Sequence, residues 1–406
     1  MAEANRRLAV SLDVSAVPEQ PAGAGRYILE IAGQLGRRPE LDLTLIARKG
    51  DSSRWRCLGA GARVLDPVPT RRPARLAYER SLMGPWIRRL RQPSIEVHHG
   101  PHYTMPGRTG PVATVVTIHD LTFVDHPEWH ERSKVPVFRQ AIRRAARVAD
   151  AIVCVSELTA ERLRVLLAPR GEVFVAPHGV DTGRFGPTDI RPRGGGRDAE
   201  LLSAAGFDLS RRYVLHLGTI EPRKGIVELV EAFAVLARHD GDLDLVLAGL
   251  PGWGSGEVER AISASGLGGR IRRLGWVPDE LVPALVRNAA VVAYPSYEEG
   301  FGLPALETLA CGARLVTTAG TAMSEVAGGS AWTAVPHEVA SLAEALDRAL
   351  RATPDEVAAR RELGLERSAE YTWERAATVH VAAYRCALSR AGRRSGMKAR
   401  GGSSIG

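Results

Sequence analysis

Apolar and polar positions alternate along the chain in two patterns. Short runs rich in β-branched residues predict buried strands at 8–14, 41–48, 112–120, 150–156 and 171–177. Longer stretches with helical spacing of apolar residues lie between them and predict helices at 26–38, 73–91, 135–150 and 156–168. Ser156 is the expected N-cap of the last of these helices. Strands that alternate with helices of this length predict βαβ units and a parallel sheet.

The alternation stops in the segment 186–200, which is rich in Gly, Pro and charge and predicts a linker. It then restarts, with strands expected at 213–219, 243–249, 271–277, 290–296 and 313–318. The helices expected in this half are 225–239, 256–266, 279–289, 304–312, 340–352 and 355–390. The predicted fold class is therefore α/β, with two tandem doubly wound, Rossmann-like domains. Such domains bind ligands at the carboxyl ends of their strands, so the active site is expected in the cleft between them.

Composition excludes several classes of protein. The chain has 406 residues, of which 45% are hydrophobic and 25% charged, values typical of globular proteins and not of disordered ones. No apolar run reaches the roughly 18 residues of a membrane span, and the first residues contain no secretory apolar core. The four cysteines are widely scattered and form no CxxC pair, which argues against structural zinc. We therefore expect a cytoplasmic protein.

The positive charge is concentrated in two segments. The formal net charge is +8, yet residues 71–91 hold seven Arg against one Glu, and residues 386–406 hold four Arg and one Lys with no acid. Such segments fit an anionic membrane surface or a polyanionic acceptor, or they are solvated, with the tail disordered. Neither carries aromatic residues in a nucleic-acid-binding pattern, so no nucleic-acid partner is expected.

A pair of cations follows the first strand of the second half, in the run GTIEPRKG. Arg223 and Lys224 stand directly before a predicted helix, and Gly218 ends the strand. Adjacent cations at a helix start suit a diphosphate, because the free amides and the helix dipole there also favour anions.

Two carboxylates stand eight positions apart in the run EGFGLPALE. Glu299 lies in a Gly-rich turn, whereas Glu307 lies about one turn inside the helix that Pro304 begins. They are therefore a poor acid/base pair for a hydrolase, and separate roles suit them better. Glu299 can accept hydrogen bonds from sugar hydroxyls, and Glu307 can bind ribose hydroxyls. The amides of Phe301, Gly302 and Leu303 at the helix start can hold phosphate oxygens.

With these motifs in view, nearly the whole chain resembles glycosyltransferase family 4 (glycosyltransferases group 1), which has the GT-B fold. The resemblance is carried by the PAGAGR loop, HHGPHYTMP, TIHDLTF, VCVSELTAERL, VAPHGVDTGRF, LGTIEPRKGI, GLPGWG, LGWVPDE, EGFGLPALE and TWERAA. Within the family the sequence is most similar to bacterial mannosyltransferases. Two segments, TAMSEVAGG and SAWTAVPHE, depart from the family pattern near the donor site and leave the donor's identity open.

The resemblance implies further roles. Gly23 and Gly25 would approach the donor diphosphate or the acceptor cleft. His119 and Asp120 would face the donor sugar and, with Glu299, form the catalytic set. No cofactor and no metal are implied, because Arg223 and Lys224 would take the place of a cation. The histidines His98, His99 and His102 have no acidic ligand at a metal-binding spacing and are expected to line the cleft or to be structural.

The expected domains are an acceptor-binding domain at 1–185, a linker at 186–212 and a donor-binding domain at 213–370. A helix at 371–390 would return to the first domain, and 391–406 would form a disordered basic tail. The expected function is retaining transfer of a hexose from a nucleotide sugar to a glycan or lipid-linked acceptor, with mannose from GDP-mannose favoured. A UDP- or ADP-sugar donor and a non-catalytic nucleotide-sugar-binding protein are the alternatives. An epimerase or phosphorylase is disfavoured, since a phosphorylase needs a pyridoxal lysine and Lys224 already has a role.

Overall fold

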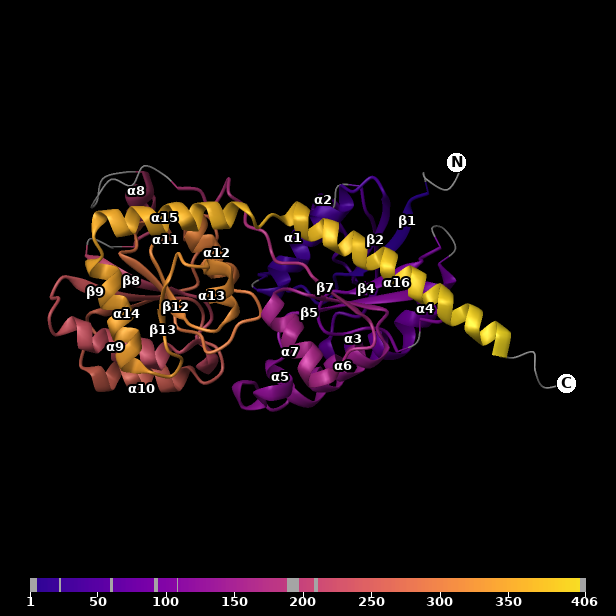
Figure 1. Cartoon of the computed structure of the whole chain (residues 1–406), viewed down its shortest axis with the longest axis horizontal. Helices are drawn as coiled ribbons and strands as arrows, with labels where there is room; N and C mark the ends of the chain where they lie inside the picture. Colours follow the sequence, from indigo (N-terminus) through magenta and orange to yellow (C-terminus); the bar gives the residue numbers. More distant parts are fainter. Residues whose placement is uncertain are drawn as a thin grey trace. The chain divides into compact units, whose positions relative to one another are not determined.

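The computed structural model describes residues 6–21, 23–58, 61–90, 94–107, 109–187, 197–207 and 211–401, without the side chains of Leu58 and 395–401. The chain divides into two compact units, Met1–Gly179 with Trp373–Gly406, and Val180–Thr372. Each unit has its own parallel sheet with helices on both faces (Figure 1). In the part of the chain described here, no helix is both long and apolar enough to cross a bilayer.

The first unit is built on a sheet with strand order β3-β2-β1-β4-β5-β6-β7. Its strands are β1 Leu8–Asp13, β2 Leu41–Arg48, β3 Arg63–Val68, β4 Val97–Gly100, β5 Ala113–Ile118, β6 Ala151–Cys154 and β7 Glu172–Val175. Its helices are α1 Ala24–Gly36, α2 Ser52–Leu58, α3 Arg72–Tyr78, the π-helix Glu79–Met83, α4 Gly84–Arg89, α5 Thr122–Asp125, a 3₁₀ turn Pro127–Trp129, α6 Val135–Val148, α7 Glu157–Leu167 and α16 Trp373–Gly401. All strand pairs are parallel, and the central strands are buried throughout because helices cover both faces.

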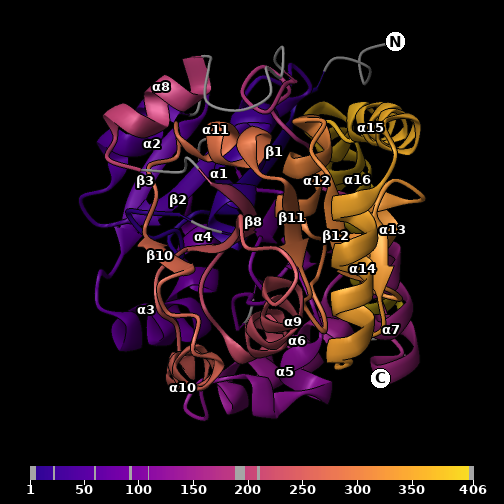
Figure 2. The same cartoon turned by 90° about the vertical axis from the view of Figure 1, so that its left-hand side faces the viewer.

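The second unit has the strand order β10-β9-β8-β11-β12-β13, and Figure 2 shows β10, β8, β11 and β12 in this sequence across the sheet. Its strands are β8 Arg212–Leu217, β9 Leu243–Ala248, β10 Ile271–Gly275, β11 Val291–Tyr294, β12 Leu315–Thr318 and β13 Trp332–Ala334. Its helices are α8 Arg197–Ala204, a 3₁₀ turn Pro222–Lys224, α9 Ile226–Ala237, α10 Ser255–Ser265, α11 Val282–Asn288, α12 Leu303–Ala310, α13 Ala322–Ala327, α14 Val339–Arg351 and α15 Pro354–Ala369. Apolar side chains of α9 and α14 pack on the sheet and form its core.

Several boundaries differ from the sequence prediction. Val180 belongs to the second unit, where its amide donates to the carbonyl of Tyr371 at 3.1 Å. The segment expected to be only a linker contains α8, and Asp198 of this helix accepts two hydrogen bonds from Arg287 of α11 at 2.6 and 2.8 Å. The rest of that segment, 188–196 and 208–210, lies outside the described residues.

The last helix differs from the prediction mainly at its end. Helix α15 ends at Ala369 and α16 begins at Trp373, close to the start expected for the helix at 371–390. Helix α16 then continues to Gly401, into the segment for which the sequence predicts a disordered tail. This extension is stabilised by burial of Ala391 and by an ion pair of 2.5 Å between Arg394 and Asp150. Residues 402–406 lie outside the described part.

Candidate functional site

The order of the strands brings two of the predicted motifs together. The second sheet is built outward in both directions from β8 and β11, which are neighbours although more than seventy positions separate them in the chain. The carboxyl ends of these two strands form the switch point of the sheet, where doubly wound folds bind ligands. The turn with Arg223 and Lys224 follows β8, and the loop with Glu299 follows β11.

Glu299 lies against both cations. Its carboxylate is 2.8 Å from the guanidinium of Arg223 and 3.9 Å from the ammonium of Lys224. Burial acts to raise the pKa of Glu299, but the charges of Arg223 and Lys224 and the hydrogen bonds from Arg223 and Ser296 together outweigh it and leave this pKa below its ordinary value. Burial lowers the pKa of Lys224, and the charge of Glu299 opposes this effect. The three side chains thus form one charged cluster.

Further hydrogen bonds of Arg223 and a close backbone approach hold the same cluster in place. Arg223 also donates to the carbonyl of Glu298 at 3.2 Å and to the carboxylate of Glu221 at 3.3 Å. Gly225 ends the turn with φ 63°, and a Cβ there would lie 2.3 Å from the carbonyl oxygen of Pro295. The turn and the loop therefore touch through backbone atoms, and glycine is required at this contact.

Glycines also line the neighbouring strand ends. The amide of Gly218 donates to Ala248 at 2.8 Å, and the amide of Gly249 donates to Gly275 at 2.7 Å. A Cβ on Gly218 would lie 2.7 Å from Nζ of Lys224. Gly218 is among the residues predicted from the sequence, whereas Gly249 is not. The signal for Gly249 is in the sequence, since it is the last residue of the strand predicted at 243–249.

The predicted helix start lies beside this cluster in sequence and in space. Gly302 is the N-cap of α12 with φ 99°, and a Cβ there would lie 2.5 Å from Cγ of Met323. Phe301 and Leu303 are buried, and the Phe301 ring meets Tyr371 edge-on at 5.7 Å. Glu307 is buried inside α12. Its charge and that of Glu299 both raise the pKa of Tyr294, after the larger effect of burial.

In the first unit, His119 follows β5 and is buried among aromatic rings. Its Nε2 donates to the carbonyl of Pro101 at 2.9 Å, which leaves Nδ1 as the acceptor of the neutral ring. Burial lowers the pKa of His119, although the Pro101 bond and Asp120 oppose this. Asp120 accepts hydrogen bonds from the amide and hydroxyl of Thr122 at 3.2 and 2.8 Å and so holds the start of α5.

The two predicted loop glycines have different environments. Gly23 is the N-cap of α1 with φ 48°, is exposed, and has no atom within 4 Å of an added Cβ. Gly25 is buried, and an added Cβ would lie 3.0 Å from Pro21. Close packing within the loop accounts for a glycine at position 25, whereas position 23 leaves room for another molecule near the backbone.

The other histidines singled out from the sequence are held by protein groups. His98 pairs with the hydroxyl of Ser11 at 2.9 Å, and His99 pairs with Thr117 and Tyr384 at 2.8 and 2.9 Å. The ring of His102 lies 5.6 Å from that of His119. Among the described residues, no group of three or more His, Cys, Asp or Glu side chains is placed to hold a metal ion.

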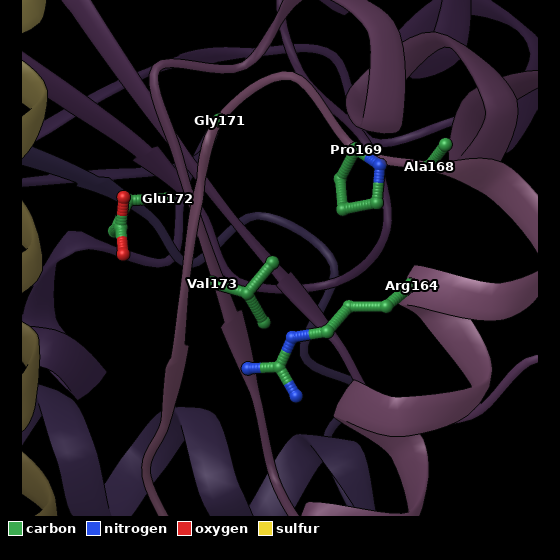
Figure 3. A pocket seen from close by; sticks show the side chains of 6 residues that line it. All are labelled: Arg164, Ala168, Pro169, Gly171, Glu172 and Val173. Atoms are coloured by element: carbon green, nitrogen blue, oxygen red, sulfur yellow. The ribbon is translucent and has the colours of Figure 1, made fainter.

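A surface hollow of about 370 Å³ in the first unit involves none of the predicted site residues. It is lined by Arg164, Ala168, Pro169, Gly171, Glu172 and Val173, and Figure 3 shows Arg164 reaching toward Val173 while Glu172 points to the other side. The hollow lies where β7 begins, at the amino ends of the strands. Ligands of doubly wound sheets bind at the opposite edge, so this hollow is not the candidate site.

Comparison with known proteins assigns the chain to a family. Residues 21–184 match Glycosyltransferase Family 4, and residues 199–363 match Glycosyl transferases group 1. The O-antigen chain mannosyltransferase B of Escherichia coli is 30% identical over 293 residues, which cover 71% of this chain and 74% of that protein. This chain is a family 4 glycosyltransferase. Glycosyltransferases of this family are retaining hexosyltransferases.

Other relatives of this glycosyltransferase agree with the assignment. The MMP alpha-(1->4)-mannosyltransferase of Mycolicibacterium hassiacum is 30% identical over 62% of this chain and 58% of that protein. The sucrose-phosphate synthase of Thermosynechococcus elongatus is similar in structure, with a TM-score of 0.70 at 20% identity, covering 93% and 98% of the two chains. WaaG, a glycosyltransferase involved in lipopolysaccharide biosynthesis, has a TM-score of 0.67 at 17% identity, covering 91% and 98%. These structures share the GT-B fold that the sequence predicts.

Proposed function

We propose that this glycosyltransferase transfers mannose from GDP-mannose, with retention, to a hydroxyl of a glycan or lipid-linked acceptor in polysaccharide or glycoconjugate synthesis. The cluster of Arg223, Lys224 and Glu299 at the switch point of the second sheet carries the proposal. Two cations fit a diphosphate, and the carboxylate beside them fits the hydroxyls of the sugar attached to it. The two mannosyltransferase relatives support the choice of sugar.

Each donor-site residue then has a role. Arg223 and Lys224 neutralise the diphosphate, together with the amides of Phe301, Gly302 and Leu303 at the start of α12. Gly218 leaves the space in which the ammonium of Lys224 lies. Glu307 binds the ribose hydroxyls, and Glu299 orients the transferred sugar while holding Arg223.

The transfer step breaks the bond between the anomeric carbon and the diphosphate oxygen, and the electron pair stays on that oxygen. The acceptor oxygen forms its bond to the anomeric carbon from the same face, and its proton passes to the departing phosphate oxygen. Negative charge grows on the diphosphate during this step, so the preorganised cations stabilise the transition state more than the bound donor. No protein nucleophile is needed.

Residues of the first unit complete the proposed set. Nδ1 of His119 accepts a hydrogen bond from a sugar hydroxyl, because Nε2 already donates to the carbonyl of Pro101. Asp120 keeps the strand end that carries His119 in place through Thr122. The exposed backbone at Gly23 is open to the substrate, whereas Gly25 maintains the loop.

A peripheral membrane partner is a separate part of the proposal. Five of the arginines in the basic segment are exposed on α3, the π-helix and α4 or just before them: Arg71, Arg72, Arg80, Arg88 and Arg89. Arg91 lies outside the described residues. An exposed Leu82 accompanies them, and basic surfaces with apolar residues favour anionic lipid.

Nucleotide titration tests the donor assignment. Calorimetric titrations of the purified protein with GDP, UDP and ADP, and then with the matching nucleotide sugars, are expected to give selective binding of GDP and GDP-mannose. A preference for UDP or ADP would keep the glycosyltransferase and overturn the donor. Binding of a nucleotide sugar without transfer to any glycan acceptor would favour a non-catalytic binding protein, and no nucleotide binding would overturn the donor site.

A further inference from the structure

Tyr297 joins the loop that carries Glu299 to the helix that follows Lys224. Its amide donates to the carbonyl of Arg223 at 2.9 Å, and its hydroxyl donates to the carboxylate of Glu228 in the first turn of α9. Arg223 donates in the reverse direction to the carbonyl of Glu298. The loop and the turn are thus joined at two successive residues, next to the position of Glu299.

The carboxylate of Glu228 depends on the Tyr297 hydroxyl for its hydrogen bond. Among the described residues, Tyr297 is the hydrogen-bond donor to Glu228, and Oε2 of Glu228 is buried without a partner. A cavity of about 10 Å³ lies against Glu228, Tyr297 and His337. Loss of the Tyr297 hydroxyl would remove the hydrogen bond that the described residues donate to this half-buried carboxylate, and we expect the loop to shift in response.

The ring of Tyr297 is held from the other side by His337. The two rings stack with centroids 3.7 Å apart and planes inclined by 29°. His337 lies between β13 and α14 and has φ 63°, a left-handed conformation that is uncommon for a residue other than glycine. A backbone held in this conformation at a stacking contact indicates that the surrounding structure fixes the ring position.

We propose that Tyr297 is a positioning residue for transfer, which sets the placement of Glu299 through its contacts with Glu228 and His337. This inference rests on the proposed function of the cluster. Tyr297 does not touch the diphosphate or the sugar in this proposal; it acts through the backbone two residues before Glu299. A displacement of about 1 Å in a catalytic group costs on the order of 100-fold in rate, so a change in this loop affects the transfer step more than nucleotide binding.

The test compares two tyrosines that each lose one hydroxyl. Tyr297→Phe keeps the ring stacked on His337 but removes the bond to Glu228, and we expect kcat to fall at least tenfold while Kd for GDP changes less than threefold. Tyr213→Phe is the matched control, because Tyr213 is buried in the same unit and its hydroxyl donates to Leu285 at 2.8 Å. Tyr213 lies near the start of β8, at the end away from Gly218, so its variant is expected to keep the wild-type kcat.

Glu228 gives a second, independent comparison. Glu228→Gln retains an acceptor for Tyr297 and should retain most of kcat, whereas Glu228→Ala should lower kcat as much as Tyr297→Phe does. The double variant Tyr297→Phe with Glu228→Ala should have a kcat no lower than either single variant. Equal kcat in Tyr297→Phe and Tyr213→Phe would overturn the inference, as would equal kcat in Glu228→Gln and Glu228→Ala. Failure of the wild-type protein to bind any nucleotide would instead overturn the proposed function. If Tyr297→Phe does not fold, the Glu228 pair decides alone.

Discussion

The phenol oxygen of Tyr27 lies 2.7 Å from Nε2 of His380, although 353 positions separate the two residues in the chain. His380 Nδ1 donates to the carbonyl of Ala376 at 2.7 Å, so Nε2 of the neutral ring accepts from Tyr27. The Tyr27 oxygen then accepts from Thr117 at 2.9 Å, and Thr117 accepts from His99 at 2.8 Å. This buried chain of hydrogen bonds fastens α16 to α1 and β5 and fits the uncharged ring of His380 that burial favours.

Stability is therefore expected to fall in mild acid. Burial lowers the pKa of His380 and of His216 to about 4, and that of His98 and His102 to about 3. In the unfolded chain these histidines take up protons near the ordinary histidine pKa of about 6.5, whereas in the folded protein they stay neutral until a lower pH. The free energy of unfolding therefore drops as pH falls from about 6.5 to 4. Urea unfolding followed by circular dichroism between pH 4 and 8 measures this.

A His380→Gln variant isolates one of these groups. Its free energy of unfolding should depend less steeply on pH, by up to about 1.4 kcal/mol per pH unit within that window. Tyr27→Phe should instead lower stability by about 1–3 kcal/mol at every pH, since it leaves buried partners unsatisfied without removing a titrating group. An unchanged slope in His380→Gln would contradict the assignment of a neutral, buried His380.

Replacement of Glu299 should separate binding from transfer. Glu299→Ala removes one carboxylate from beside Arg223 and Lys224, while Arg223 keeps Glu221, so the affinity for a nucleoside diphosphate should be kept or increased. Transfer should fall at least 100-fold, because the sugar and Arg223 both lose their orienting group. Calorimetry with GDP and a product assay on the same protein preparation measure the two effects. If transfer survives the substitution, the site is assigned to the wrong residues.

A methyl group at position 218 should weaken nucleotide binding. In Gly218→Ala the new Cβ would lie 2.7 Å from Nζ of Lys224, and the backbone at φ 147° is unfavourable for alanine. We expect the ammonium to be displaced and Kd for GDP to rise about tenfold in a folded protein. Gly256→Ala, on α10 with no atom within 4 Å of the added carbon, is the control and should bind GDP like the wild type.

The tautomer of His119 predicts which substitution is tolerated. Asparagine places its amide where Nδ1 lies and glutamine places it where Nε2 lies, so His119→Asn should keep more transfer activity than His119→Gln if Nδ1 contacts the sugar. Nitrogen NMR shifts of the imidazole in the free enzyme should show Nε2 protonated, as the bond to Pro101 requires. A protonated Nδ1, or greater activity in the glutamine variant, would contradict this arrangement.

Removal of exposed arginines should weaken binding to anionic liposomes. Arg88→Ala with Arg89→Ala removes two charges from the surface of α4, and at about 1 kcal/mol per charge the partition coefficient should fall about 30-fold in co-sedimentation at low salt. Arg348→Ala with Arg351→Ala removes two charges from α14 in the other unit and should have no such effect. Equal binding by the two double variants would remove the membrane from the proposal.

The sequence alone determined the fold class and the order of most elements, and it predicted the residues of the proposed donor site. Local periodicity fixes long strands and helices, and local capping fixes their ends: Ser156 accepts from the amide of Thr159 at 3.1 Å, and α12 begins beside Pro304. The sequence missed β3, β4 and β13 because these strands are short or carry proline and histidine in place of an apolar run.

Only the tertiary structure decided which of these residues meet. No local pattern relates Arg223 to Glu299 or Tyr297 to Glu228; they meet because β8 and β11 are neighbours at the centre of one parallel sheet. The same holds for Tyr27 and His380, which come together because α16 packs on the first sheet after the whole second unit has intervened. The periodicity of apolar residues indicates which face of each helix or strand is buried. It does not indicate which distant element covers that face, because the apolar faces are buried against one another only in the complete fold.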